Sequence, residues 1–329
     1  MRFRFEAIIT AAAVFALLLY LAPIPAATQG GQAAGGGAQA GAPPQGGGQQ
    51  GGAAAQRGGR GGGGRGQRGA ATPAGPAPRL PNGKPDLSGH WANPYTPNMA
   101  GRGGMGALDP MTRQPLNFPH KGEPLPNTPK DGSGGNKTYD LPFTEWGLQM
   151  WKDYDAVTNG DYAGSCMPFG MSRSINSPHG LQIVQNNDTL AFLFEQNTWF
   201  HLVPTNPAFI KWPADLPQAW NGVSVGHWEG DTLIVETSNF HGWTRLDTAG
   251  HPHSSQLKMI NTFLRTDSRT IQHTVTVHDP KTYTVDWMNV RNWNLKPATD
   301  VLMEYSCEEN NRGAQDGTIH PWRPPDVEP

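Results

Sequence analysis

The sequence predicts an all-β fold, most simply an antiparallel up-and-down barrel with one helix ahead of it. Short runs of β-prone residues follow one another from residue 181 onward, and apolar and polar residues alternate within them with a period of two. Turn residues separate the runs at hairpin spacing, as at Gly230-Asp231. Closing such a sheet on itself removes its exposed edges, although strand number and turn chemistry also allow a sandwich.

Residues 1–27 have the pattern of a secretory signal segment. Arg2 and Arg4 precede a run over residues 7–22 that is apolar or small apart from Thr10, and small residues follow up to Ala27. An uncleaved membrane anchor is the alternative interpretation, but the run is shorter than the roughly 20 residues that a membrane span needs. We therefore expect a secreted or periplasmic protein, with membrane contact only through this segment.

We predict that residues 28–80 form a disordered tether. They are rich in Gly, Ala, Gln and Arg, and almost no large apolar side chain is present to offset an ordering cost of about 1 to 2 kcal/mol per residue. The stretch 56–69 is similar to RGG segments that bind RNA, but a flexible spacer is the expected role in an exported protein.

The charge of the remaining chain argues against nucleic acid as a partner. Residues 1–79 contain seven Arg and one Glu. The rest of the chain therefore has 18 basic and 26 acidic residues, and its net charge is about −8. An acidic surface repels phosphate groups. We therefore predict no nucleic-acid binding, and we expect a monomer that binds a small molecule.

An irregular arm and a helix are expected between the tether and the barrel strands. Residues 81–141 are dense in Pro, Gly and Asn, with a first strand at 86–91. The barrel domain is expected over 142–312, followed by a tail over 313–329. Thr144 can cap a helix that places Trp146, Met150, Trp151 and Tyr154 on one face and ends before Asn159-Gly160.

The predicted barrel strands are short and regularly spaced. They cover residues 181–185, 189–195, 198–203, 223–229, 232–237, 257–265, 270–278, 284–293 and 301–306.

The chain contains two cysteines, Cys166 and Cys307. In an oxidising compartment such a pair more often forms a disulfide than stays reduced, so we predict a bridge. Two buried thiols are the alternative.

The segment from Leu246 to Ser254 is the densest polar cluster of the sequence. Asp247 and His253 are the predicted catalytic residues, with His253 as a general base oriented by Asp247. The spacing of His251 and His253 would also suit a metal, but no further ligand can be named from spacing, and no metal is predicted. A structural loop whose side chains satisfy backbone donors is a third interpretation.

Several aromatic and polar residues are candidates for a ligand pocket. His273 is in phase with Ile271 and Val275, so it points to the apolar face of its strand. The alternative is that such side chains fill the core. The predicted ligand-binding residues are Trp228, His251, Ser254, His273 and Tyr305.

Known catalytic and cofactor motifs are weak or missing. Ser224 lies in a G-x-S-x-G match, but it leads into a hairpin and not into the strand-to-helix turn of a nucleophile elbow. No Walker or Rossmann glycine pattern stands between a strand and a helix, and neither C-x-x-C nor H-E-x-x-H occurs. We therefore predict no cofactor.

Four strings together resemble a family of exported, functionally uncharacterised proteins of acidobacteria and related soil bacteria. They are SVGHWEGDTLIVET (224–237), GHPHS (250–254), DPKTY (279–283) and EYSCEEN (304–310). The resemblance covers about residues 140–311 and implies a lipocalin-like barrel, for which DLSGHW (86–91) is similar to an opening strand. The chain departs from the family pattern at Asn261-Thr262, where relatives tend to have Glu-Arg, and over 198–205, which lacks an Arg and a Gly-rich turn.

Three functions are consistent with these features. The first is a barrel that binds a small, partly apolar molecule, and the second is a His/Asp acid-base hydrolase, lyase or isomerase acting on a natural product or sugar derivative. The third is a tethered structural or interaction protein of the cell envelope. A polar pocket that joins His253 to Asp247 would favour the enzyme, an aromatic pocket would favour binding, and a filled barrel would favour the structural role.

Overall fold

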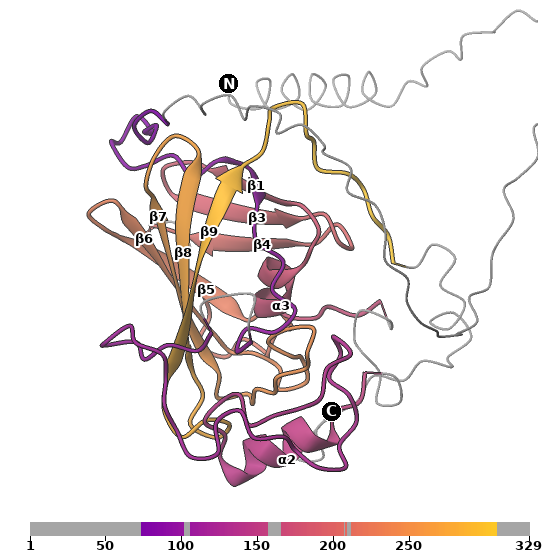
Figure 1. The fold of residues 1–329 in the computed structure, drawn as a ribbon. Coiled ribbons are helices and arrows are strands. Elements are labelled where there is room, and N and C mark those ends of the chain that lie inside the picture. The colour runs from indigo at the N-terminus through magenta and orange to yellow at the C-terminus, as the bar shows by residue number, and fades with distance from the viewer. Residues whose placement is uncertain (1–73, 102–105, 157–165, 207, 209–211, 308–329) are drawn as a thin grey trace, which may run out of the picture. The chain divides into compact units, whose positions relative to one another are not determined.

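Nine antiparallel strands form one sheet that rolls into a nearly closed barrel (Figure 1). The computed structural model describes residues 74–101, 106–156, 166–206, 208 and 212–307. The predicted signal segment, the tail and most of the tether therefore lie outside the described residues. The elements are β1 (Gly89–Ala92), α2 (Glu145–Asp153), α3 (Met171–Asn176), β2 (Leu181–Gln185), β3 (Thr189–Phe194), β4 (Phe200–Pro204), β5 (Val223–Glu229), β6 (Thr232–Ser238), β7 (Lys258–Arg265), β8 (Thr270–His278) and β9 (Trp287–Leu295).

The strand order confirms the up-and-down arrangement. The sheet runs β4-β3-β2-β1-β9-β8-β7-β6-β5, so every pair of neighbours is also adjacent in sequence except β1 and β9. Trp91 and Ala92 of β1 pair with Leu295 and Asn294 of β9, and this ladder joins the first four strands to the last five. The sheet then ends at β4 on one side and at β5 on the other.

The hairpin turns form where the turn residues predicted them. The Asn186 side chain accepts hydrogen bonds from the backbone N–H groups of Asp188 and Thr189, which fixes the β2–β3 turn. Gly230 has a φ of +57°, a conformation that favours glycine, and Glu229 pairs with Thr232 across this two-residue turn.

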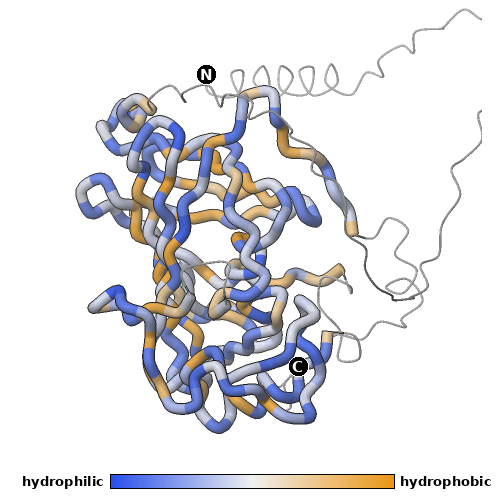
Figure 2. The backbone as a smooth tube through the Cα atoms, viewed as in Figure 1, coloured by the Kyte–Doolittle hydropathy of each residue, from blue (hydrophilic) through white to orange (hydrophobic). Residues whose placement is uncertain are grey.

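Hydrophobic and hydrophilic residues are interspersed along the strands (Figure 2), and alternate side chains are buried in the core. Ile271, Val275 and Val277 of β8 are buried and belong to one core cluster. Phe192 of β3 meets Phe263 of β7 with ring centroids 5.5 Å apart. Because these strands belong to the two different halves of the sheet, this contact shows that apolar side chains meet across the barrel.

One predicted strand does not form. Residues 301–306 make one isolated bridge, between Tyr305 and Gln196, and they belong to none of the nine strands. Val301 and Met303 are 63% and 62% exposed, so this segment buries little apolar surface. The prediction was wrong because β1 already occupies the position beside β9, and the segment has no free strand edge there.

Helix α2 confirms the predicted cap and apolar face. The Thr144 hydroxyl accepts from the backbone N–H of Gly147 at 3.1 Å, and Met150 and Trp151 are buried. At Gly147 a Cβ atom would lie 2.2 Å from the carbonyl oxygen of Thr282, so the helix packs there by its backbone. Helix α3, with all six residues buried, was not predicted because fewer than two turns are too short to show a helical period.

The arm covers the outside of β9. Leu108 forms a bridge with Met288, and both residues cluster with Val290 on the outward face of the strand. No helix in the described ranges has the length and apolarity needed to cross a membrane.

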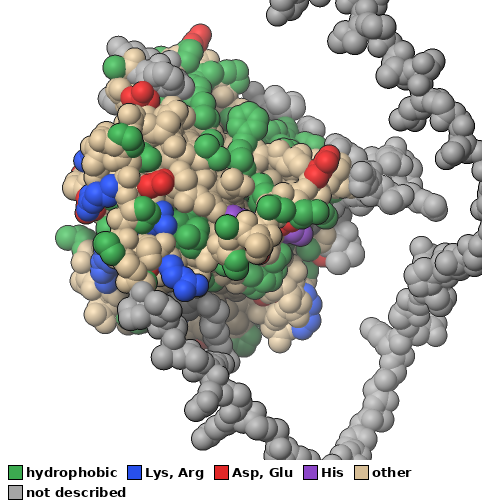
Figure 3. Space-filling model, turned by 90° about the horizontal axis from the view of Figure 1, so that it is seen from above, with side chains coloured by type: hydrophobic (Ala, Val, Ile, Leu, Met, Phe, Trp, Pro, Cys, Tyr) green, Lys and Arg blue, Asp and Glu red, His purple; other side chains and the backbone are tan. Residues whose placement is uncertain are grey.

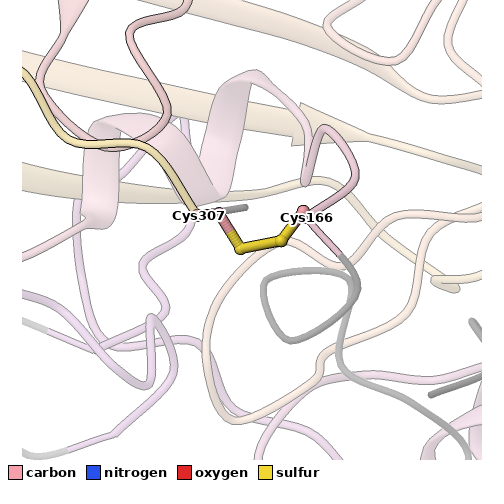
Figure 4. Close-up of a disulfide and its surroundings, with 2 residues drawn as sticks. All are labelled: Cys166 and Cys307. Carbon is pink, nitrogen blue, oxygen red and sulfur yellow. A yellow bond between two sulfur atoms is a disulfide. The ribbon is translucent and has the colours of Figure 1, made fainter. Parts of the chain in front are cut away.

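The predicted disulfide is confirmed. Cys166 and Cys307 are bonded with their Cα atoms 5.3 Å apart, and the bridge ties the segment ahead of α3 to the segment that follows β9 (Figure 4). The two cysteines are 141 residues apart in sequence, so the bridge closes a long loop in the unfolded chain.

We expect the double variant Cys166→Ser/Cys307→Ser to lose about 2 to 5 kcal/mol of unfolding free energy, because the unfolded chain regains the entropy of that loop. Urea unfolding with and without reductant checks this. The wild type should shift towards the variant on reduction and the variant should not respond. Equal stability of oxidised and reduced wild type would contradict the expectation.

Candidate functional site

A buried imidazole between two carboxylates organises the loop that the sequence singled out. His251 Nδ1 lies 2.6 Å from Asp247 Oδ2, and His251 Nε2 lies 3.0 Å from Asp140 Oδ2. Asp247 also accepts hydrogen bonds from the backbone N–H groups of Met99, Gly250 and His251. The three side chains, here called the His251 node, therefore join the arm, the residues before α2 and the 245–254 loop.

The node carries charge despite its burial. Burial by itself lowers the pKa of His251, but Asp140 and Asp247 outweigh it and raise this pKa to about 10. Burial likewise acts to raise the pKa of Asp247, and the imidazolium overcomes that effect and lowers it. At neutral pH His251 is therefore a cation that donates one hydrogen bond to each carboxylate.

Helix α2 contributes a ring to this cation. The Trp151 indole stacks on the His251 ring with centroids 4.5 Å apart, and the Lys137 ammonium lies 4.9 Å from the Trp151 centroid. Lys137 also donates to the carbonyl of Trp151 at 2.6 Å and to that of Tyr154, at the end of the helix. His251 of the loop and Lys137 of the arm thus both contact Trp151 of α2.

The predicted pair of Asp247 and His253 does not form. Asp247 is bound to His251, whereas His253 Nδ1 donates to the Ser254 carbonyl at 2.9 Å and His253 Nε2 lies 2.6 Å from the Thr244 hydroxyl. Burial lowers the pKa of His253 to about 4, so this imidazole is neutral at pH 7. The local spacing allowed either His to meet Asp247, and backbone hydrogen bonds from 250 and 251 turn the carboxylate towards His251.

Ser254 and its neighbours form a second buried hydrogen-bonded cluster. The backbone N–H and the hydroxyl of Ser254 donate to the two carboxylate oxygens of Asp279 at 2.6 Å and 2.7 Å. The Thr282 hydroxyl donates to the same carboxylate at 2.8 Å. The cluster fixes the loop against the turn before β9, which matches the structural interpretation of this segment.

The remaining predicted ligand residues lie apart from one another. His273 is fully buried in the barrel between the rings of Phe263 and Trp293, at 4.9 Å and 4.7 Å. Trp228 packs partly buried on the core beside Lys84, and Tyr305 is 42% exposed and contacts the His179 ring in a tilted arrangement. The structure does not gather the predicted residues into one pocket.

An apolar cleft lies where the sheet fails to close. It has a volume of about 510 Å³ and lies between β4 and β5. Its lining residues, which define the seam cleft, are Pro168, Thr198, Trp199, Phe200, His201, Leu202, Trp212, Leu216, Pro217, Ala219, Trp220, Asn221, Gly222, Val223 and Ser224. Phe200 is 67% exposed and Trp212 is 37% exposed, so large aromatic surface remains open to solvent there.

Two buried polar residues join β4 and β5 at the seam cleft. His201 Nε2 lies 2.6 Å from the Ser224 hydroxyl, which lies 2.7 Å from the Thr237 hydroxyl. Burial lowers the pKa of His201 to about 4, so the imidazole is neutral. No described residue provides a hydrogen bond to His201 Nδ1, and His201 is one of the residues that line the seam cleft. Ser224 lies inside β5, which confirms that the G-x-S-x-G match is not a nucleophile elbow.

Sequence reasoning missed His201, Asp140 and the seam cleft. The alternation of β4 places His201 on the same face as Val203, and the same period places Ser224 inward on β5. Only the strand order shows that these two strands lie next to each other where the sheet does not close. Asp140 lies in an irregular stretch without hydrophobic periodicity, so no sequence pattern indicated its position.

Charged side chains are scattered over the face seen in Figure 3. Hydrophobic side chains lie there among other uncharged side chains and backbone, and Lys, Arg, Asp and Glu side chains stand singly or in small groups. The described residues contain no group of three or more His, Cys, Asp and Glu side chains placed to hold a metal ion.

Neither a family model, nor a curated protein, nor a solved structure matches the chain.

The His251 node makes a stability prediction. We expect Asp140→Asn to lower the unfolding free energy by about 3 kcal/mol, because it removes one charge partner of a buried cation. Asp286→Asn is the matched control, since Asp286 pairs with His278 at 2.7 Å on the surface with about half of each side chain exposed. Urea unfolding should show a clear loss in the first variant and little change in the second, and equal losses would contradict a special role of the node.

The shifted pKa values of the histidines predict a maximum of stability near pH 6.5. An unfolded His titrates near pH 6.5. The proton on His251 therefore stabilises the fold fully below that pH, and this contribution falls as the pH rises to about 10. His201 and His253 act in the opposite sense, because the unfolded chain binds their protons first as the pH falls from 6.5 to about 4. Urea midpoints measured across this range check the curve, and Asp140→Asn should flatten only its alkaline side.

Proposed function

We propose that this protein binds a small, mainly aromatic molecule in the seam cleft, outside the reducing cytoplasm. The observation that carries the proposal is an open cleft of about 510 Å³ lined by four large aromatic side chains, Trp199, Phe200, Trp212 and Trp220. Ligand sites of this size are usually apolar, with a few polar groups that fix orientation. The bridge between Cys166 and Cys307 supports an oxidising location.

The aromatic walls of the cleft are held in place before any ligand arrives. The Trp212 indole N–H donates to the Ser224 carbonyl at 2.8 Å. Trp199 packs on Phe169 with ring centroids 5.3 Å apart, and Trp220 meets Trp243 edge to face at 5.7 Å. A preformed site of this kind costs little ordering entropy on binding.

The polar atom in the cleft suggests what kind of ligand fits. His201 is neutral, and its Nδ1 can meet one hydrogen-bonding group of the ligand while flat apolar surface stacks on the indoles. A larger groove of about 760 Å³ runs along the outer face of β5 and β6, but its walls include Glu236, Lys258 and His278. The seam cleft is the better site for an apolar ligand.

The dye 1-anilinonaphthalene-8-sulfonate tests the proposal, because it is aromatic and fluoresces when it leaves water. We expect saturable binding with one dye per chain, and we expect Phe200→Gln to weaken binding about tenfold through loss of apolar contact. Phe200 is mostly exposed, so this variant should keep its stability.

Val225→Gln is the control for the dye experiment. Val225 is 44% exposed on β5 but lines the outer groove and not the seam cleft. Its dye affinity should equal that of the wild type. Binding that is lost equally in both variants, or that does not saturate, would refute the site.

A further inference from the structure

The inner face of β7, β8 and β9 carries a group of polar side chains that the proposed function does not use. Asn261, His273, Asn289 and Arg291 all point into the barrel and are buried. In the sheet His273 lies opposite Arg291, and Asn289 lies opposite Val275, one inward position along β8 from His273. Polar residues in a barrel interior are costly unless each of them finds a partner.

Several polar atoms of this face have no partner within the described residues. His273 Nε2 and Asn261 Oδ1 are hydrogen-bonded at 3.0 Å, but the other polar atom of each side chain is unpaired. The unpaired buried atoms are Asn261 Nδ2, His273 Nδ1, Trp287 Nε1, Asn289 Oδ1, Arg291 Nε and Trp293 Nε1. An orphaned buried group in a folded protein usually indicates a bound water, ion or ligand.

Donors outnumber acceptors in this set. Four of the six atoms are N–H donors, those of Asn261, Trp287, Arg291 and Trp293, and two are acceptors, His273 Nδ1 and Asn289 Oδ1. Reversing the Asn261 amide together with the His273 tautomer exchanges one free donor for another, so the excess of donors does not depend on either assignment. A partner for this face must therefore mainly accept hydrogen bonds.

Charge favours an anion over water as that partner. Arg291 is 6% exposed and donates to the Asn176 side-chain oxygen, and it forms no ion pair with any carboxylate in the described part of the chain. Asp247 acts on it through space, but the Asp247 carboxylate is in contact with His251. Water satisfies hydrogen bonds without neutralising a buried guanidinium, whereas an anion does both.

We propose that a small anion, either a free inorganic ion or the carboxylate of an organic molecule, occupies the barrel interior beside His273 with Arg291 as its cationic partner. The N–H groups of Asn261 and Trp293 supply the neutral donors of this site. It is separate from the seam cleft, whose lining contains none of these residues.

Anion-dependent stability tests the proposal. The protein is unfolded, refolded in a zwitterionic buffer without added salt to remove any bound ion, and melted after sodium chloride, formate or benzoate is added at equal concentrations. Above half-saturation, the wild-type Tm should rise by about 4 °C for each tenfold increase in the free concentration of the anion that binds. A response to chloride and formate alike identifies a free ion, and a much stronger response to benzoate identifies the carboxylate of a larger molecule. No response to any of the three would overturn the proposal.

Two arginines on the inner face provide a matched comparison. Arg265 is also 6% exposed, but its guanidinium donates to the backbone carbonyls of Asp86, Asp267 and Ser268. Arg265→Met should therefore keep the anion response, and Arg291→Met should lose it. The same response in Arg291→Met as in the wild type would refute the site.

A third variant keeps the test decisive if Arg291→Met does not fold. Asn176 already accepts from Arg291, so Asn176→Asp places a carboxylate on the guanidinium at nearly constant shape. The Tm of this variant should not change with added anion, because its new carboxylate already neutralises the Arg291 guanidinium. A folded Asn176→Asp protein whose Tm still follows the anion concentration would show that the effect arises elsewhere.

Discussion

The pairing of β1 with β9 is the constraint on which the rest of the structure depends. Without this short ladder the chain would be two separate meanders, β1 to β4 and β5 to β9, each with one apolar face open to water. With it, Phe192 and Phe263 meet across one core, and the break in the sheet is displaced to β4 and β5. The position of the seam cleft is thus a consequence of which strands close the barrel.

The environment of each buried histidine decides its charge. His251 meets two carboxylates and is held as a cation, whereas His201 and His253 meet hydroxyl or carbonyl oxygens and are held neutral by burial. Burial, together with the charge of Arg291 opposite it in the sheet, also lowers the pKa of His273 well below the usual value. Histidine therefore serves in this protein as a charged link between segments and as a neutral hydrogen-bonding group at the seam and in the interior.

The fold separates two kinds of surface that differ in what they can accept. The seam cleft combines open indole and phenyl surface with one free imidazole nitrogen, which suits a flat apolar molecule. The inner face of β7 to β9 is closed and rich in N–H donors around a guanidinium, which suits a small acceptor of negative charge. The inner face follows from alternation along β7 to β9, whereas the seam cleft follows from the strand order that leaves β4 and β5 at the two ends of the sheet.

The sequence by itself determined the all-β class, most strand positions, the capped helix at Thr144 and the disulfide, because these depend on local periodicity, turn chemistry or the presence of two cysteines. It also placed His273 on an inward face and Asp247 in a polar loop. Only the tertiary structure decided that Asp247 binds His251 and not His253, that 301–306 finds no strand partner, and that His201 faces Ser224. Those outcomes depend on contacts between segments far apart in the chain, such as Asp140 with His251, and no local pattern of residues encodes which distant segments will meet.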